Sequence, residues 1–410
     1  MAVNKNIKKL YCDTVIAGCG VAGLYTALNM SEDTKIIMLS KEDVASCDSM
    51  LAQGGICVLH DENDYDAFFE DTMRAGHYEN RKESVDIMIR SSRAVINDLI
   101  SYGVDFERDE KGELCYTKEG AHSRARICFH EDITGKEITE KLLAAVRKRP
   151  NVTIMEYTTM TDILEVNKEC VGLVAKTQDN KKLHIYAKDT VLATGGIGGL
   201  YEHSTNFPCL TGDGCSIAAK HGAELEHMDY VQIHPTSLYT DKPGRAFLIS
   251  ESARGEGAII LNHKGERFVN ELLPRDIVTE AIHKEMEKEG VKHEFLSFEN
   301  VDKEMILHHF PNIYEKCLEE GYDILKEPIP IVPAQHYFMG GIHVDSDSMT
   351  TIPHLYAAGE TSCNGVHGKN RLASNSLLES LVFAKRITEK IQNVQKGKEE
   401  YESDYDAACC

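Results

Sequence analysis

A glycine-rich turn near the start of the chain constrains its fold more than any other feature. An apolar run at residues 14–17 leads directly into Gly18-Cys19-Gly20-Val21-Ala22-Gly23, and a helix-like segment follows to about Met30. In such a turn the first glycine permits a sharp reversal, the second lets a pyrophosphate approach the backbone, and the third lets the helix pack against the strand. Residues 35–39 supply a second apolar strand where a βαβ unit requires one. The sequence therefore predicts a Rossmann-like unit that binds a dinucleotide.

The end of that second strand bears on which dinucleotide binds. The acidic residue that usually holds an adenosine ribose is replaced by Ser40 and Lys41, with Glu42 one position late. This departure argues against NAD. A serine hydroxyl and a lysine ammonium can both engage ribose or phosphate oxygens, so the pattern is compatible with FAD.

Two further apolar strands end in glycine, at residues 190–196 and 355–360. A strand that ends in small residues can pass close to a bulky ligand. Together with the first turn, they place glycine-ended strands at the beginning, middle and end of the chain. We therefore expect one sheet that is assembled from distant segments around one dinucleotide.

The segment between those strands is more polar and charged, from about residue 228 to 337. Apolar periodicity predicts a helix at 276–289 and a second around 302–318, and the prolines at 328, 330 and 333 predict a hinge or linker. The expected fold class is α/β, with a discontinuous nucleotide-binding domain and an inserted α+β capping domain. The expected boundaries are 1–227 and 338–410 for the two parts of the nucleotide domain and 228–337 for the cap.

Charge and cysteine content exclude several classes of partner. Asp plus Glu number 66 against 45 Lys plus Arg in the 410 residues, and the formal net charge is −21. Such a field repels phosphate backbones and anionic lipid headgroups, so neither nucleic acid nor a membrane is an expected partner. The thirteen cysteines are scattered and form no CxxC pair, which argues against a disulfide framework and against a bound metal. A reducing cytoplasm is the expected compartment.

Polar motifs beyond the glycine turn indicate a dicarboxylate substrate. Arg275 and Arg371 carry guanidinium forks that can bind carboxylates bidentately, and His234 and His336 can act as neutral donors. Each residue alone has an ordinary structural explanation, such as a hydrogen-bonded histidine or a surface ion pair. Their occurrence in both the insertion and the nucleotide domain predicts a cleft where the two meet. Further polar motifs in the same regions are Ser250-Glu251, Arg254-Gly255-Glu256-Gly257 and His343.

Ten motifs, taken in order, give the chain a resemblance to a known family. They are GCGVAG, LAQGG, ATGG, TGDG, HPT, RGEG, PRDI, HYFMGGI, LYAAGE and NRLASNSLLE. Over essentially its whole length the chain resembles the flavoprotein family of succinate dehydrogenase, fumarate reductase and L-aspartate oxidase. The dehydrogenases and membrane fumarate reductases of that family carry a flavin-linking histidine where this chain has Asp48. Segment 118–124 also resembles a motif of the oxidase branch, whose glutamate, here Glu119, sits near the substrate amino group.

The resemblance implies where FAD and substrate bind. Glu360 would accept hydrogen bonds from ribityl hydroxyls, and Ser376 with Leu377 would direct a helix start toward the flavin N1/O2 edge. Arg275 would transfer the proton. The implied FAD contacts are Gly18, Gly20, Val21, Ala22, Lys41, Ser49, Ala52, Gln53, Gly54, Gly55, Asp213, Glu360, Ser376 and Leu377. The implied substrate residues are Glu119, His234, Ser250, Glu251, Arg275, His336 and Arg371.

The resemblance also implies an activity. The expected reaction is oxidation of L-aspartate to iminoaspartate by non-covalently bound FAD, as the first step of de novo NAD biosynthesis. Oxygen or fumarate would reoxidise the flavin, and iminoaspartate would pass to quinolinate synthase. The alternatives are a soluble fumarate reductase and, among non-enzymes, a flavin-binding redox sensor or assembly subunit. Family members usually add a C-terminal helical domain, which we expect to be absent or truncated because only residues 380–410 follow the last motif.

Overall fold

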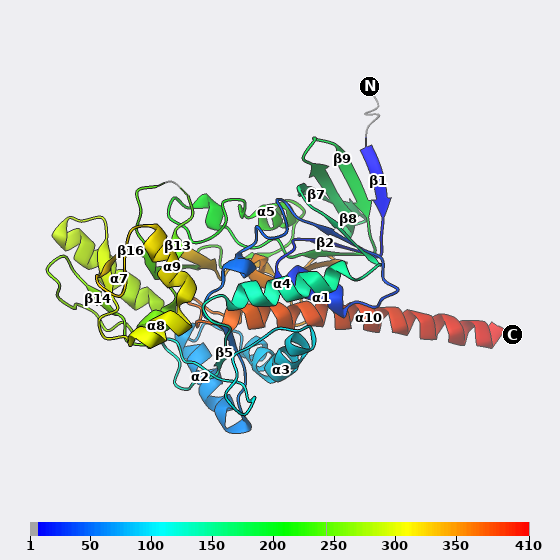
Figure 1. Ribbon diagram of the computed structural model, residues 1–410. Helices are drawn as coiled ribbons and strands as arrows, with labels where there is room; N and C mark the ends of the chain where they lie inside the picture. Colours follow the sequence, from blue (N-terminus) through cyan, green and yellow to red (C-terminus); the bar gives the residue numbers. More distant parts are fainter. Residues whose placement is uncertain (1–6, 243, 410) are drawn as a thin grey trace.

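A five-stranded parallel sheet forms the centre of the protein (Figure 1). The computed structural model describes residues 7–242 and 244–409, and it describes side chains up to residue 394. The strand order of the sheet is β18-β10-β2-β3-β6. Strands β2, β10 and β18 are those predicted to end in glycine, and they are hydrogen-bonded neighbours in parallel register. The prediction of one sheet built from distant segments is therefore confirmed. The bounds are β2 (Thr14–Ala17), β3 (Ile36–Leu39), β6 (Val152–Met155), β10 (Asp189–Leu192) and β18 (Leu355–Ala357).

Alternate residues of these strands face two different layers. Ile16 and Met38 pack into a cluster formed by helices, whereas Val15 and Ile37 pack against a four-stranded sheet of order β1-β9-β8-β7. This alternation is the period of two expected for strands. The helices are α1 (Val21–Asn29), α2 (Tyr65–Ala75), α3 (Lys82–Ser101), α4 (Thr134–Arg147) and α10 (Asn375–Cys409). The strands of the second sheet are β1 (Ile7–Tyr11), β7 (Thr158–Val166), β8 (Glu169–Thr177) and β9 (Lys182–Tyr186).

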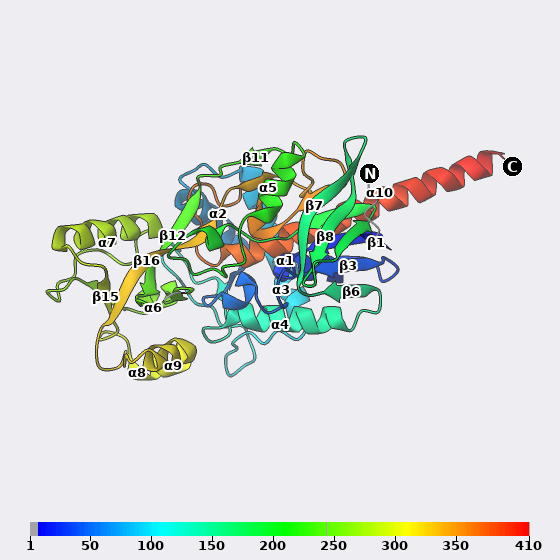
Figure 2. The same ribbon diagram turned by 90° about the horizontal axis from the view of Figure 1, so that it is seen from above.

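A separate hydrophobic cluster lies in the insertion, at the end of the molecule that carries α7, α8 and α9 (Figure 2). Its antiparallel sheet has the order β13-β12-β16-β15-β14, and Ile260, Ile282 and Ile331 are among its fully buried residues. The predicted α+β character of the insertion agrees with these elements, while the domain boundaries stay a prediction. The strands are β12 (Val231–Leu238), β13 (Phe247–Leu248), β14 (Ile259–Leu261), β15 (Glu294–Ser297) and β16 (Ile329–Phe338). The helices are α6 (Glu251–Gly255), α7 (Arg275–Glu289), α8 (Lys303–His309) and α9 (Pro311–Glu319).

Two predictions for the insertion are wrong. The proline cluster is not a linker, because Pro330 and Pro333 lie within β16. The missing N–H of Pro333 is tolerated because a bulge in β12 leaves Pro235 and Thr236 opposite it. The helix predicted around 302–318 is two helices, because the ring of Pro311 disfavours helical geometry at Phe310, which separates α8 from α9.

The remaining elements connect these layers. Helix α10 packs on α1 and α3 and then projects from the body of the molecule (Figure 1). Within the described residues, no helix is long and apolar enough to cross a membrane. The short elements are β4 (Ile56–Cys57), β5 (Ile127–Cys128), β11 (Leu225–Glu226), β17 (Gly341–His343), β19 (Ser362–Cys363), α5 (Asp213–Lys220) and the 3₁₀ turns η1 (Asp48–Leu51), η2 (Glu62–Asp64), η3 (Gly198–Leu200) and η4 (Gly359–Thr361).

Candidate active site

One cavity collects every residue that the sequence analysis assigned to the cofactor and the substrate. It lies at the carboxyl ends of β2, β3, β10 and β18 and continues to the antiparallel sheet of the insertion. Ligands of open α/β sheets usually bind at this edge. The cofactor candidates on the cavity wall are Gly18, Gly20, Val21, Ala22, Lys41, Ser49, Ala52, Gln53, Gly54, Gly55, Asp213, Glu360, Ser376 and Leu377. The substrate candidates are Glu119, His234, Ser250, Glu251, Arg275, His336 and Arg371.

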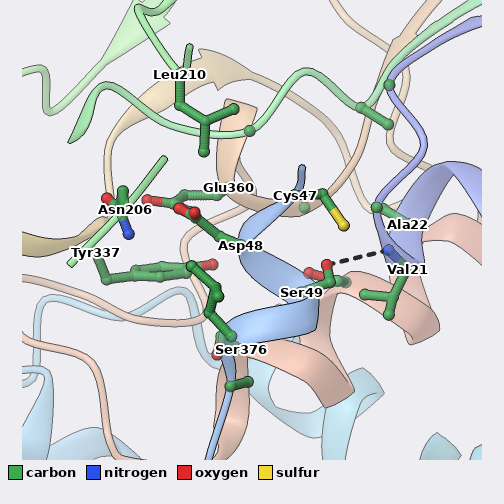
Figure 3. A pocket seen from close by; sticks show the side chains of 18 of the residues that line it. Val21, Ala22, Cys47, Asp48, Ser49, Asn206, Leu210, Tyr337, Glu360 and Ser376 are labelled. Atoms are coloured by element: carbon green, nitrogen blue, oxygen red, sulfur yellow. Dashed lines mark hydrogen bonds between the residues drawn. The ribbon is translucent and has the colours of Figure 1, made fainter. Parts of the chain in front are cut away.

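The glycine turn has the geometry that its spacing predicts. Gly18 adopts a φ of +116°, and a Cβ there would lie 1.9 Å from the Ala193 carbonyl oxygen. A Cβ on Gly23 would lie 2.1 Å from the Gly18 oxygen, so both positions exclude a side chain. The Val21 amide at the start of α1 donates to Ser49 Oγ at 3.1 Å (Figure 3). The turn therefore brings the start of α1 and the loop after β3 to the same wall of the cavity.

Lys41 joins the end of β3 to the start of α5. Its Nζ donates to the Cys209 carbonyl at 2.8 Å, to Thr211 Oγ1 at 3.0 Å and to Asp213 Oδ2 at 2.8 Å. The ammonium thus fixes a loop that comes from a distant part of the chain. The Lys41 ammonium and the Asp213 carboxylate thus present one cationic and one anionic group that suit the ribose and phosphate groups of a nucleotide.

Asp48 and Glu360 are two half-buried residues whose carboxyl groups lie on the same wall (Figure 3). Asp48 Oδ1 accepts from the Phe207 amide and Glu360 Oε1 from the Phe338 amide, both at 2.9 Å. Burial raises the pKa of Asp48 to about 7. Burial, with the nearby charge of Asp48, raises the pKa of Glu360 to about 8. At neutral pH these groups therefore hold at least part of a proton, and they can donate as well as accept hydrogen bonds.

Several buried polar atoms on this wall have no protein partner within the described structure. They are Asp48 Oδ2, Gln53 Oε1 and Asn206 Oδ1. Buried polar atoms are nearly always hydrogen-bonded in native proteins. Together with the glycine turn, they fit a polar, elongated ligand such as a dinucleotide.

Arg275 begins α7 and reaches across the cavity. Its Nε donates to Glu251 Oε2, and its Nη1 donates to Gln232 Oε1 at 2.9 Å. Gln232 Nε2 in turn donates to the Arg371 carbonyl at 2.8 Å. Burial alone would raise the pKa of Glu251, but the guanidinium groups of Arg275 and Arg254 outweigh it and lower that pKa. Glu251 is therefore an ionised carboxylate on the cavity wall.

Glu119 supplies a second buried carboxyl. Ser374 Oγ donates to its Oε2, and Ser252 Oγ donates to its Oε1 at 3.0 Å. A Cβ on Gly54 would lie 2.1 Å from Glu119 Oε1, so a larger residue there would displace the Glu119 carboxylate. Burial, and then the negative charge of Glu251, raise the pKa of Glu119. A cationic ligand group would reverse this effect by stabilising the ionised form.

His234 and His336 lie in contact with an edge-to-face geometry, with ring centroids 5.1 Å apart. Burial, followed by the positive charge of Arg275, lowers the pKa of both rings, so both are neutral. The Thr236 amide donates to His234 Nδ1 at 3.2 Å, which leaves the proton on Nε2. That buried Nε2–H has no protein partner within the described residues and is free to donate to a ligand.

Arg371 completes the site from the loop before α10. Its Nη1 donates to Ser376 Oγ at 3.0 Å, and its guanidinium lies 4.6 Å from the Tyr337 ring centroid. Burial and the charge of Arg275 lower its pKa to about 10, so it stays protonated at neutral pH. Its buried Nε has no protein partner in the described structure. With Arg275 it provides two guanidiniums, which suits a ligand with two carboxylates.

Sequence reasoning missed some groups in this site and included others that do not line it. Ser252, Ser374 and Tyr337 lie inside or beside the quoted motifs, but no spacing rule assigns their hydroxyls or ring a partner. The position of Gln232 in the site could have been predicted, because Gln232 lies two residues before His234 and strand periodicity puts both side chains on one face. His343 lies outside the cavity, 3.0 Å from Glu226 Oε1. Arg254 does not line the cavity either, and its Nη2 lies 3.5 Å from Glu251 Oε2.

Known proteins share this sequence and architecture. The family model described as "FAD binding domain" matches residues 13–377. An L-aspartate oxidase of Clostridium perfringens is 51% identical over 399 residues, which cover 96% of this chain and 90% of that protein. An L-aspartate oxidase of Clostridium acetobutylicum is 48% identical, over 93% of this chain and 88% of that protein. The solved structure of an E. coli quinol fumarate reductase has a TM-score of 0.88 at 30% identity and covers 94% of this chain and 70% of that one.

Proposed function

Because this chain belongs to the FAD binding domain family that includes the L-aspartate oxidases and fumarate reductases, we propose that it oxidises L-aspartate to iminoaspartate. The observation that carries the proposal is a buried carboxyl, Glu119, in a cavity that also presents Arg275 and Arg371. The positive charge of the two guanidiniums suits a ligand with two carboxylates, and one carboxylate beside them suits an ammonium. Aspartate has all three groups, whereas succinate and fumarate lack the ammonium.

The cofactor of this reaction is FAD, bound without a covalent link. The glycine turn, Lys41 with Asp213, and the buried atoms of Gln53 and Asn206 without partners would hold it. The chemistry that FAD would supply when bound is acceptance of the hydride from the substrate α-carbon. Asp48 stands where the covalently flavinylated relatives have a histidine, and its carboxyl cannot form the histidyl bond. Its Oδ1 is already engaged by the Phe207 amide, which favours a role in shaping the wall.

The substrate carboxylates would be bound by Arg371 and by the neutral donors His234 and His336. A neutral histidine can donate from Nε2 without adding a cation that would compete for Glu119 or Glu251. The buried Arg371 Nε and His234 Nε2 lack protein partners in the described structure, so they offer their N–H groups to a ligand. Such contacts fix the α-carbon before reaction, and orientation of this kind supplies a large part of catalysis.

As the α-carbon loses its hydride, the α-ammonium must lose a proton, and transfer of that proton would fall to Arg275, which passes its own Nε proton to Glu251 Oε2. A guanidinium is normally always protonated, so it can exchange a proton only beside an ionised acceptor in a site that excludes water. Glu251 meets this need, because it is 3% exposed, its pKa is lowered and it accepts from Arg275 Nε. Glu119 would hold the substrate ammonium and so turn the α-hydrogen in a fixed direction.

A soluble fumarate reductase is the second candidate, favoured by the similarity to the E. coli quinol fumarate reductase. The arginines and histidines would serve either dicarboxylate, and Arg275 would then deliver a proton in the reverse direction. Fumarate can also serve the oxidase as an electron acceptor, as oxygen can.

In the proposed role as an L-aspartate oxidase, the enzyme catalyses the first step of de novo NAD biosynthesis and passes iminoaspartate to quinolinate synthase. We place it in the cytoplasm, in keeping with the free thiols of the eleven cysteines from Cys12 to Cys363.

An anaerobic comparison of substrates tests the assignment. The FAD-loaded protein is mixed with L-aspartate or with succinate, and loss of the oxidised flavin absorbance is followed. We expect rapid bleaching by L-aspartate and little by succinate, with D-aspartate as a stereochemical control. Bleaching by succinate alone would favour the reductase, and bleaching by neither would favour a binding protein without dicarboxylate turnover.

A further inference from the structure

A buried charged cluster stands behind the loop that carries Glu119. Arg126 is fully buried, and its Nε and Nη2 donate to the two carboxylate oxygens of Asp64 at 2.9 and 3.0 Å. Its Nη1 donates to Asp71 Oδ2 at 2.8 Å. Because Nε, Nη1 and Nη2 each donate to a carboxylate oxygen, the guanidinium is held in one orientation. Loss of one partner from a buried network of this kind is costly.

That orientation determines the tautomer of His122. Arg126 Nη1 lies 3.0 Å from His122 Nδ1, and a guanidinium can only donate, so Nδ1 carries no proton. The proton is therefore on Nε2, which donates to the Ala373 carbonyl at 3.0 Å. Burial and the charge of Arg126 lower the pKa of His122 to about 4, so the ring keeps this form at neutral pH.

The Ala373 carbonyl fixes the peptide that leads to Ser374. Ser374 adopts a φ of +61°, a left-handed conformation that is costly for a residue with a Cβ and persists only where the surroundings hold it. The Ser374 carbonyl is held by the Cys57 amide at 3.0 Å, and its hydroxyl donates to Glu119 Oε2. One chain of hydrogen bonds thus runs from Arg126 through His122 and Ser374 to Glu119.

We propose that His122 is a positioning residue for amino-acid oxidation. Its Nε2–H, oriented by Arg126, holds the peptide that aims the Ser374 hydroxyl at Glu119, and this contact keeps the Glu119 carboxylate directed at the substrate ammonium. His122 itself does not line the cavity. The inference rests on the proposed function, because a substrate without an ammonium gains nothing from the position of Glu119.

Two substitutions of His122 distinguish the role of its Nε2 from that of its Nδ1. In His122→Gln the side-chain amide nitrogen can take the place of Nε2 and donate to Ala373, whereas the shorter His122→Asn keeps a polar atom only near Nδ1. We expect the Gln variant to keep kcat/KM for aspartate within about two-fold, and the Asn variant to lose about ten-fold, the effect of one displaced charge-assisted contact. Fumarate reduction by the dithionite-reduced enzyme should stay within about two-fold in both variants, since fumarate lacks the ammonium.

A double-mutant cycle with Glu119→Gln shows whether His122 acts through Glu119. If it does, His122→Asn should change aspartate oxidation by less than about two-fold in the Glu119→Gln background. FAD content and thermal midpoint report folding of every variant, and Ser374→Ala, which removes only the hydroxyl, provides a second test if the Asn variant does not fold. Additive losses in the cycle, or equal losses with aspartate and fumarate, would overturn the proposal. Wild-type protein that does not oxidise aspartate at all would contradict the proposed function itself.

Discussion

Replacement of Glu119 by glutamine removes one negative charge from the cavity while it keeps the shape of the side chain. Glu119 is 4% exposed, so an ammonium that meets it is desolvated, and such a charge-assisted contact is worth about 1.5–3 kcal/mol. That range corresponds to roughly 10- to 150-fold in kcat/KM. Because burial and Glu251 raise the pKa of Glu119, part of this energy ionises the carboxyl, and we expect a loss of roughly 10- to 100-fold.

The assay compares two reactions on one protein preparation. Aspartate-dependent flavin reduction should fall in the glutamine variant, while fumarate reduction by the reduced enzyme should be preserved or improved. The Ser252 hydroxyl, which donates to Glu119 Oε1, can still donate to the glutamine carbonyl, so the loop should keep its position. Equal losses in both reactions, or no loss in either, would refute the role of Glu119 and leave it as an anchor of its loop.

Three further predictions concern other parts of the molecule. Arg275→Leu should retain FAD but lose turnover at saturating aspartate by several powers of ten, whereas Arg371→Leu should mainly raise KM; near-normal kcat in the first variant would contradict proton transfer by Arg275. Acid precipitation should release the flavin into the supernatant, since the resemblance to the family puts Asp48 where flavin-linking members have a histidine; yellow colour that stays in the washed pellet would contradict this. Glu294 is fully buried, neither carboxylate oxygen has a partner in the described structure, and burial raises its pKa from 4.5 to about 7. The folded state therefore binds the extra proton, stability should fall as pH rises from about 4.5 to 7, and Glu294→Gln should recover about 1–3 kcal/mol at pH 8, measured by denaturant unfolding at pH 5 and 8.

The sequence predicted those parts of the fold that depend on local patterns. The glycine turn, the strands around it and the helix at 276–289 follow from spacing and periodicity, which act within a few residues. The resemblance to a family then predicted a set of residues that the structure places on one cavity wall, although they come from segments hundreds of residues apart. Local rules alone could not have joined Gly18 to Arg371.

Other features depend on contacts that no local pattern reports. Pro330 and Pro333 are typical of a linker by composition, yet they lie in a strand whose partner bulges around one of them. The direction of the Ser374 hydroxyl depends on a left-handed φ that is held by His122 and Cys57 from other parts of the chain. Burial raises the pKa of Asp48 and of Glu360, and the charge of Asp48 raises the pKa of Glu360 further.

The bulges in the β12–β16 pair explain how the insertion supplies its histidines to the site. Gln232 pairs with Tyr337 and Ile233 with Gln335, so His336 is an extra residue of β16 without a partner in the ladder. A second irregularity follows directly after His234, where two residues of β12 oppose one residue of β16. Bulges bend a strand and redirect side chains, and they are common beside active sites. If the Gln232–Tyr337 register continued without the bulge, His336 would oppose Ile233 and point to the face opposite His234. With the bulge, both rings line the same cavity and meet edge to face. Pro235 and Pro333 lie within the second irregularity, where neither can donate to a ladder, and so they help keep the irregular register in place.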